Sequence, residues 1–311
     1  MSARKIVVLA TGGTIAGTAA SAGDNVGYSA AQIGIEQLLA RIPALQGLPV
    51  LAEQVAQIDS KDMDWDVWRA LAQRCAHWLA QDSVQGIVIT HGTDTLEETA
   101  YFLQQVLAPA KPVVLTCAMR PATALLADGP QNIVDALAVA AWPGAQGVVA
   151  VCAGVVHAAD DVAKVHPYRL DAFGSGDAGP LGHVEEGRLR LLRNWPVAPV
   201  NTAPSAIENI AKAQQLPRVE IVLNHAGASG AMVRDLVAGG VRGIVVAGTG
   251  NGTLHQGLEA ALLAAQAGGV ALLLASRCAN GSIVRHAAGP IRMHARSAVK
   301  ARIDLQLELL A

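Results

Sequence analysis

The sequence predicts an α/β protein of two domains, a larger N-terminal one on a mostly parallel sheet with flanking helices and a smaller C-terminal α/β one. Apolar runs of strand length alternate with helical patterns, as in consecutive βαβ units. The 311 residues are long for a single domain. Apolar residues make up 52% of the chain and charged residues 15%, which suits strands buried on both faces.

The elements follow from these patterns in chain order. We expect strands over residues 5–9, 86–90, 112–117, 147–152, 219–223, 243–247 and 270–274. We expect helices over residues 30–42, 96–107, 132–141, 254–267 and 300–310, and another over about 63–79 with Asp62 as its cap. Residues 18–28 have the small, polar composition of a mobile surface loop.

A proline-rich stretch marks the expected domain boundary. Residues 196–204 contain three prolines and no apolar period, which is typical of a stiff linker. We therefore predict an N-terminal domain over residues 1–193, a linker over 194–215 and a C-terminal domain over 216–311.

Charge and composition exclude several classes of partner. The net charge is -2, so the chain lacks the excess of positive charge that is typical of proteins that bind nucleic acid or anionic membranes. The chain as given shows no secretory signal and no apolar run long enough to span a membrane. We expect a cytoplasmic protein that acts on a small molecule.

The sequence predicts no metal site and no cofactor. The four cysteines lack the close spacing of a zinc site, and we expect each to be a small core residue: Cys75, Cys117, Cys152 and Cys278. A metal site made of Asp160, Asp161 and His166 is an alternative, but nothing else completes a ligand set, so a solvated loop is favoured.

Two expected strands end in turns that present a threonine. Residues 91–95 (HGTDT) follow the strand at 86–90, and residues 10–17 (ATGGTIAG) follow the strand at 5–9. The second turn resembles a dinucleotide fingerprint, but Thr14 stands where the middle glycine is needed and would obstruct a pyrophosphate. Thr93 and Asp94 could simply cap a helix. The repetition of the feature favours a ligand site at the strand ends.

A threonine hydroxyl needs a proton acceptor before it attacks. Asp94 stands beside Thr93, and Lys164 is the leading candidate for a buried amine. Glycine-rich turns offer N–H groups for an oxyanion, while serine-hydrolase, zinc-protease and phosphate-loop motifs are missing from the sequence. The pattern indicates acyl transfer through threonine. Tyr28 is either a surface anchor or a catalytic partner.

Longer motifs resemble a known family. Residues 11–17 (TGGTIAG) and 90–100 (THGTDTLEETA) are similar to the two signatures of the bacterial-type L-asparaginase family. Residues 118–121 (AMRP) and 127–132 (ADGPQN) resemble two further family segments. Their order and spacing match along nearly the whole chain.

The resemblance implies hydrolysis of L-asparagine to L-aspartate and ammonia, with an acyl-enzyme on threonine. It makes Thr14 the nucleophile, assisted by Tyr28, and makes Thr93, Asp94 and Lys164 a second catalytic group that polarises a hydroxyl and the water. The order in which the two threonines attack stays open.

The resemblance also implies the contacts that hold the substrate. Asp94 matches the residue that binds the α-amino group, and Ser60 matches the one that binds the α-carboxylate, with Asp59 beside it. Asp59 and Ser60 could also be simple capping residues. His91 lies inside the second signature, and we interpret it as structural.

The family implies a homotetramer, a dimer of dimers, in which Asn251 of a neighbouring copy completes each site. Two departures stand out. Lys61 replaces a substrate-contacting glutamine of many secreted members, and Asp59-Ser60 is similar to the cytoplasmic branch. No acidic residue stands in the segment 276–286, where the family usually supplies a glutamate to the substrate amine. We therefore predict weak or no glutaminase activity.

Two alternatives remain at this stage. The first is an asparaginase-like subunit that supplies ammonia to a partner acting on charged tRNA, although such subunits usually carry a further N-terminal domain. The second is a non-catalytic amino-acid-binding protein, against which all five expected catalytic side chains are present.

Overall fold

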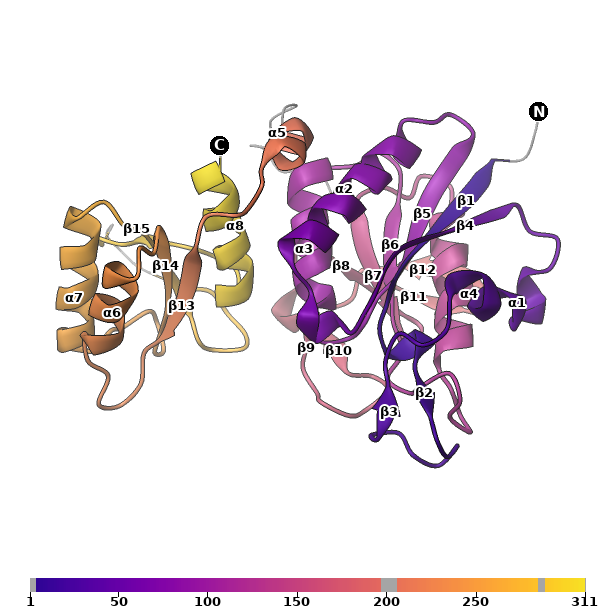
Figure 1. The fold of residues 1–311 in the computed structure, drawn as a ribbon, viewed down its shortest axis with the longest axis horizontal. Coiled ribbons are helices and arrows are strands. Elements are labelled where there is room, and N and C mark those ends of the chain that lie inside the picture. The colour runs from indigo at the N-terminus through magenta and orange to yellow at the C-terminus, as the bar shows by residue number, and fades with distance from the viewer. Residues whose placement is uncertain (1–3, 197–205, 285–288, 311) are drawn as a thin grey trace. The chain divides into compact units, whose positions relative to one another are not determined.

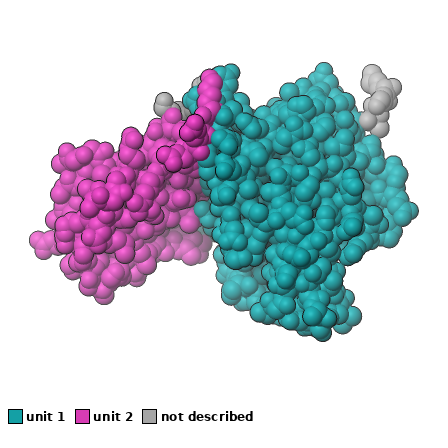
Figure 2. All heavy atoms as spheres, in the orientation of Figure 1, with its two compact units in different colours: residues 1–211 teal, residues 212–311 magenta. Residues whose placement is uncertain are grey.

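The computed structural model describes residues 4–196, 206–284 and 289–310. The chain divides into two units, residues 1–211 and 212–311, shown in different colours in Figure 2. Each unit has its own sheet and its own buried core, so each is described by itself.

The main sheet of the first unit has eight strands within the described residues, in the order β12-β11-β8-β7-β6-β5-β1-β4 (Figure 1). Strands β4, β1, β5, β6 and β7 run parallel, and β8, β11 and β12 extend this sheet with antiparallel pairs. The strands are β1 (Lys5–Gly12), β4 (Val50–Ile58), β5 (Val84–Thr90), β6 (Val113–Thr116), β7 (Val148–Cys152), β8 (Val155–Ala158), β11 (Gly182–Glu185) and β12 (Arg188–Leu191).

Helices cover both faces of this sheet, because successive strand residues are apolar on both sides (Figure 1). Val8 and Val88 pack in one core with Ile133 of α4 and Leu38 of α1. On the other face, Trp68 of α2 stacks on Phe102 of α3, with 4.7 Å between the ring centroids. The helices that cover the sheet are α1 (Ile35–Ala40), α2 (Trp65–Leu79), α3 (Leu96–Leu107) and α4 (Gly129–Ala140), and α5 (Ala206–Lys212) follows later in the chain.

Two small antiparallel pairs lie outside the main sheet: β2 (Thr18–Ala19) with β3 (Tyr28–Ser29), and β9 (Ala163–Lys164) with β10 (Phe173–Gly174). Short 3-10 helices connect several elements: η1 (Thr14–Ala16), η2 (Pro43–Leu45), η3 (Ser60–Asp62) and η4 (Gly176–Ala178). Of these pieces, η1 and η3 directly follow the carboxyl ends of β1 and β4, where open parallel sheets bind ligands.

The second unit is a smaller parallel sheet, β13-β14-β15-β16, with helices on both faces. Val246 packs with Leu258 of α7, whereas Val245 of the same strand packs with Leu305 of α8. The elements are β13 (Val219–Leu223), α6 (Ala231–Ala238), β14 (Gly243–Gly248), α7 (Gln256–Ala267), β15 (Ala271–Ser276), β16 (Arg292–Met293) and α8 (Ala298–Leu310).

The predicted fold class is confirmed, and the main corrections concern element ends and missed strands. The helix expected over 30–42 is shorter, because α1 begins only after Gly34. Asp64, not Asp62, caps α2, since its side chain accepts a hydrogen bond from Val67 N. Strand β4 and the antiparallel strands β8, β11 and β12 were not predicted.

The segment expected as a linker, 194–215, is only partly described. Its residues 197–205 lie outside the described residues, while α5 occupies Ala206–Lys212. The predicted domain boundaries therefore stay predictions. Within the described residues, none of the helices combines the length and apolar character needed to cross a bilayer.

The cysteines follow the prediction at three of four positions. Cys75, Cys117 and Cys152 are buried, but Cys278 is exposed, so the expectation that each cysteine is a core residue is wrong for Cys278. It lies just beyond β15, where the chain has left the sheet.

Candidate active site

Thr14 lies immediately beyond the carboxyl end of β1, in the first turn of η1. Gly13 before it has a φ of +83°, a conformation that glycine adopts without strain. A Cβ at Gly13 would lie 2.4 Å from Gly92 Cα, so the two threonine turns meet backbone to backbone. Any side chain at position 13 would collide with the second turn, so this position requires glycine.

The second turn follows β5 and leads into α3. Ser60 fixes it twice: the Ser60 hydroxyl accepts a hydrogen bond from Asp94 N at 3.1 Å, and the Ser60 carbonyl accepts one from Thr95 Oγ1 at 2.8 Å. A Cβ at Gly92 would lie 2.4 Å from Ser60 Oγ. The short helix η3, which follows β4, therefore holds the turn that presents Thr93 and Asp94.

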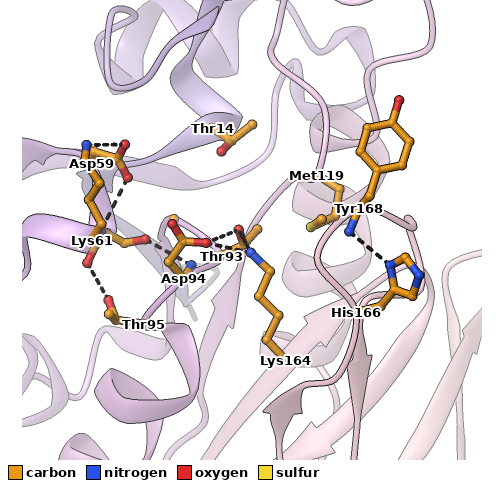
Figure 3. A network of polar contacts seen from close by, with 12 residues as sticks. Thr14, Asp59, Lys61, Thr93, Asp94, Thr95, Met119, Lys164, His166 and Tyr168 are labelled. Atoms are coloured by element: carbon orange, nitrogen blue, oxygen red, sulfur yellow. Dashed lines mark hydrogen bonds and ion pairs between the residues drawn. The ribbon is translucent and has the colours of Figure 1, made fainter. Parts of the chain in front are cut away.

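Lys164 joins this turn from β9, seventy residues along the chain. Its Nζ donates hydrogen bonds to Thr93 Oγ1 at 2.8 Å and to Asp94 Oδ1 at 2.6 Å (Figure 3). Because the ammonium donates to Thr93, the threonine's own proton is available to Asp94, whose Oδ1 lies 3.4 Å away. The Lys164 side chain is 19% exposed, so water competes little for these contacts.

Thr14 contacts a different partner. Its Oγ1 lies 2.7 Å from the hydroxyl oxygen of Tyr28, which belongs to β3. Thr14 is only 6% exposed and Thr93 7%, yet both line the same pocket of about 230 Å³. Tyr28, Asp94 and Lys164 line it as well. The structure thus brings all five predicted catalytic side chains together.

Asp59 and Ser60 lie near this pocket but are not among the residues that line it. Ser60 is 2% exposed. Asp59 caps η3 by accepting a hydrogen bond from Lys61 N, and it forms an ion pair with Lys61 Nζ at 2.8 Å. The sequence left two roles open for these residues, substrate contact or capping. In the structure, Asp59 caps a helix and Ser60 fixes a turn.

His91 is fully buried, and its Nδ1 lies 2.7 Å from Gly92 O. Burial lowers the pKa of His91 to about 4, so the ring is neutral at neutral pH and Nδ1 donates to the carbonyl. The other ring nitrogen has no partner among the described residues. The side chain does not line the pocket, which agrees with its interpretation as structural.

Sequence reasoning missed five residues of the pocket wall: Asn25, Val26, Met119, Pro167 and Tyr168. Arg120 connects two parts of this wall, because its guanidinium donates to Tyr168 O at 3.0 Å and lies 4.2 Å from the centre of the Tyr168 ring. Asp128 fixes the start of the same segment by accepting hydrogen bonds from Met119 N and Arg120 N, both at 2.9 Å. The two family segments at 118–121 and 127–132 contain Met119, Arg120 and Asp128, so they were the sequence signal that could have indicated this part of the wall.

The described residues contain no group of three or more His, Cys, Asp or Glu side chains that could hold a metal ion. Asp161 instead forms an ion pair with Arg193 at 2.8 Å. His166 accepts hydrogen bonds from Tyr168 N and Arg169 N at its Nδ1, so it fixes the segment that carries Tyr168.

Asn251 lies in the second unit, in the turn closed by the bridge between Thr249 and Thr253. Its side-chain amide binds the backbone of Val284 at both ends: Oδ1 accepts from Val284 N at 2.7 Å, and Nδ2 donates to Val284 O. An amide has further donor and acceptor capacity beyond these two bonds.

Comparison with known proteins decides the family. Residues 5–197 match the family model described as asparaginase, N-terminal, and residues 218–311 match that of the glutaminase/asparaginase C-terminal domain. The chain belongs to the asparaginase family. The resemblance inferred from the two threonine motifs is thereby confirmed.

Relatives within the asparaginase family match over most of their length. L-asparaginase 2 of Escherichia coli K12 is 38% identical over 98% of this chain and 88% of its own. A glutaminase-asparaginase of Pseudomonas fluorescens biotype A is 40% identical over 92% of this chain and 79% of its own. The crystal structure of a probable cytoplasmic L-asparaginase from Campylobacter jejuni superposes with a TM-score of 0.91 at 36% identity, covering 98% and 95% of the two chains.

Proposed function

We propose that this protein hydrolyses L-asparagine to L-aspartate and ammonia through a threonine acyl-enzyme. One observation supports this most strongly: two threonines from separate strand ends line one pocket, and each contacts a group able to move a proton. Family membership and relatives named L-asparaginase point to the same reaction.

In the first half-reaction, Thr14 Oγ1 attacks the amide carbon and gives its proton to the Tyr28 hydroxyl, which passes its own proton on to the amide nitrogen. The tetrahedral intermediate then expels the amide nitrogen, which leaves as ammonia once it is protonated. N–H groups of the two glycine-containing turns are suited to bind the oxyanion. The product of this step is a β-aspartyl ester on Thr14.

In the second half-reaction, water cleaves the ester. Thr93, Asp94 and Lys164 form the group that orients and deprotonates this water, because the lysine fixes the threonine oxygen and the carboxylate accepts a proton. The released acid is L-aspartate, and Thr14 regains its proton. The reverse order, with Thr93 attacking first, would use the same side chains.

For substrate binding, we propose that Asp94 holds the α-amino group. Its side chain is 51% exposed, so an oxygen remains open towards the pocket while Lys164 binds the other. We assign the α-carboxylate to Ser60, whose hydroxyl accepts a hydrogen bond from Asp94 N and keeps its own proton to donate.

We also propose a strong preference for asparagine over glutamine, because the C-terminal segment lacks the usual acidic residue for the substrate amine. Relatives carry both kinds of name, L-asparaginase 2 and glutaminase-asparaginase, so the ratio must be measured. Comparable kcat/KM values for the two amides would contradict the preference.

We further propose a cytoplasmic homotetramer, a dimer of dimers in which Asn251 of a neighbouring copy completes each site. Leu125 and Leu126 are 82% and 80% exposed, and large exposed apolar side chains side by side favour a protein interface. The hydrogen bond from Leu125 N to Ala22 O, 3.0 Å long, fixes this pair beside the β2–β3 connection.

Ammonia release by the purified chain tests the proposal. The protein is assayed alone with L-asparagine, L-glutamine and D-asparagine, and we expect turnover of L-asparagine without any partner. A chain that binds aspartate but releases no ammonia would instead be a binding protein. Activity that appears only with a partner would indicate an amidotransferase subunit.

A further inference from the structure

We propose that Glu97 is a positioning residue for Lys164. Its carboxylate holds the backbone of the lysine whose ammonium contacts Thr93 and Asp94. This inference rests on the proposed function of the same pocket, and it names a residue that the two threonine groups do not include.

Lys164 needs an anchor because β9 is only two residues long and lies outside the main sheet. Strand β9 pairs with β10. The backbone N–H groups of Val165 and His166 both donate to Ala172 O, just before β10. The N–H of Lys164 takes no part in this pairing, because its acceptor lies outside the hairpin.

Glu97 supplies the acceptor for that N–H. Glu97 lies in the first turn of α3, and its Oε2 accepts a hydrogen bond from Lys164 N at 2.5 Å, across 67 residues of chain. A carboxylate bound to a backbone N–H makes a shorter and stronger bond than a neutral acceptor does. The N-terminal end of a helix also favours the negative charge.

The lysine is thereby held at both ends by one continuous segment. Thr93 and Asp94 bind its Nζ, and Glu97, one turn later, binds its backbone. The 2.8 Å and 2.6 Å contacts of the ammonium therefore depend on a single strand-turn-helix unit. Loss of the backbone anchor would let Lys164 shift, and a misplacement of about 1 Å can cost about a hundredfold in rate.

Glu98 provides a matched control. It stands next to Glu97 in the same first turn of α3 and carries the same charge. Any effect that comes from helix capping or from the helix dipole should appear equally when either glutamate is replaced. An effect on Lys164 should appear only at Glu97.

The experiment compares Glu97→Ala and Glu97→Gln with Glu98→Ala and Glu98→Gln. Using L-asparagine, we expect Glu97→Ala to lower kcat by about 10- to 100-fold with KM changed less than about threefold, because the substrate contacts remain. Glu97→Gln keeps a carbonyl acceptor and should recover most of the loss. Both Glu98 variants should stay within about threefold of wild type. Equal losses at Glu97 and Glu98 would overturn the proposal.

A double-mutant test separates positioning from a general structural effect. In a Lys164→Met background, Glu97→Ala should cost less than about twofold further activity, because the group that it positions is already gone. A repeat of the full Glu97→Ala loss in that background would overturn the proposal.

Amide hydrogen exchange tests the contact without reference to catalysis. We expect the Lys164 amide to exchange at least about tenfold faster in Glu97→Ala than in wild type, and to be unchanged in Glu98→Ala. Unchanged exchange in Glu97→Ala would overturn the inference. If the wild type releases no ammonia, the proposed function fails, while this measurement still decides the role of Glu97.

Discussion

At the scale of the residue, the pocket combines side chains with distinct partners. Thr14 contacts a phenol, whereas Thr93 contacts an ammonium and lies beside a carboxylate. Two hydroxyls in one pocket thus have different proton routes. In the mechanism that we propose, this difference lets one hydroxyl attack the amide and the other assist the water.

Replacing Lys164 with methionine tests the second group. The change keeps a long, unbranched side chain but removes the hydrogen bonds to Thr93 and Asp94, so we expect kcat to fall by at least about a hundredfold. Steady-state ammonia release measures it. Lys111→Met is the control, because Lys111 Nζ binds the carbonyls of Leu79 and Gln81 away from the pocket. An equal fall in kcat for both variants would contradict the assignment.

His91 predicts a pH dependence of stability. Its folded pKa of about 4 lies below the ordinary histidine value of about 6.5, so between these values the unfolded chain binds a proton that the folded chain does not. This group therefore lowers stability as the pH falls from about 6.5 to 4, by up to about 3 kcal/mol, and has no effect above that window.

Urea denaturation between pH 4 and 7 measures this effect. We expect the difference in unfolding free energy between wild type and His91→Gln to change steadily below about pH 6.5, in favour of the variant as acidity increases. A difference that stays constant across the window would show that His91 does not titrate as its burial implies.

At the scale of the element, the site depends on where two glycine-containing turns touch. The parallel strands β1 and β5 are neighbours in the sheet, so their carboxyl ends lie side by side and their turns must share space. Gly13 and Gly92 meet at that contact.

The substitution Gly13→Ala tests this contact against backbone strain alone. Gly13 has a φ of +83° and its added Cβ would collide with Gly92, while Gly47 has a φ of +79° and open space around its Cβ position. We expect Gly47→Ala to cost about 1 kcal/mol and leave kcat unchanged. Gly13→Ala should cost more than that and lower kcat sharply. Thermal unfolding and ammonia release measure both, and similar behaviour of the two variants would contradict the account.

Element prediction succeeded where the sequence signals were strong and failed for the edge strand β4 and the short antiparallel strands. Helix α3 matches its predicted range, residues 96–107, because its apolar spacing and acidic first turn are both strong signals. Strand β4 was missed because it is the last strand in the sheet order and carries polar residues such as Glu53 and Gln54. The hairpin of β11 and β12 turns at Glu186-Gly187, both with positive φ, and the turn signal was not recognised.

At the scale of the whole molecule, the sequence predicted the two-unit α/β fold and the five side chains that meet in the pocket. Lys164 was singled out as a candidate buried amine, and the family resemblance then gave its role. The strand that carries it was not predicted, because the two residues of β9 are too few to show periodicity. Tyr168 could not be predicted, since its place in the pocket wall depends on long-range contacts from Arg120.

The oligomeric state gives a further test. We expect light scattering to yield four copies of the 32.0 kDa chain. Because Leu125 and Leu126 are 82% and 80% exposed in a single chain, the double change to glutamate should lower that mass. Leu48→Glu, at a half-exposed site, is the control. A wild-type monomer would contradict the tetramer, and an unchanged mass in the double variant would exclude this patch as an interface.

The central claim is that the hydroxyl of Thr14 attacks the amide. The most direct test is ammonia release from L-asparagine by Thr14→Ala, with Thr18→Ala in β2 as the matched control outside the pocket. Removing a nucleophile from a group that acts as a unit should lower kcat by at least about two to three orders of magnitude, while Thr18→Ala stays near wild type. A loss of less than about tenfold in Thr14→Ala would place the nucleophile elsewhere.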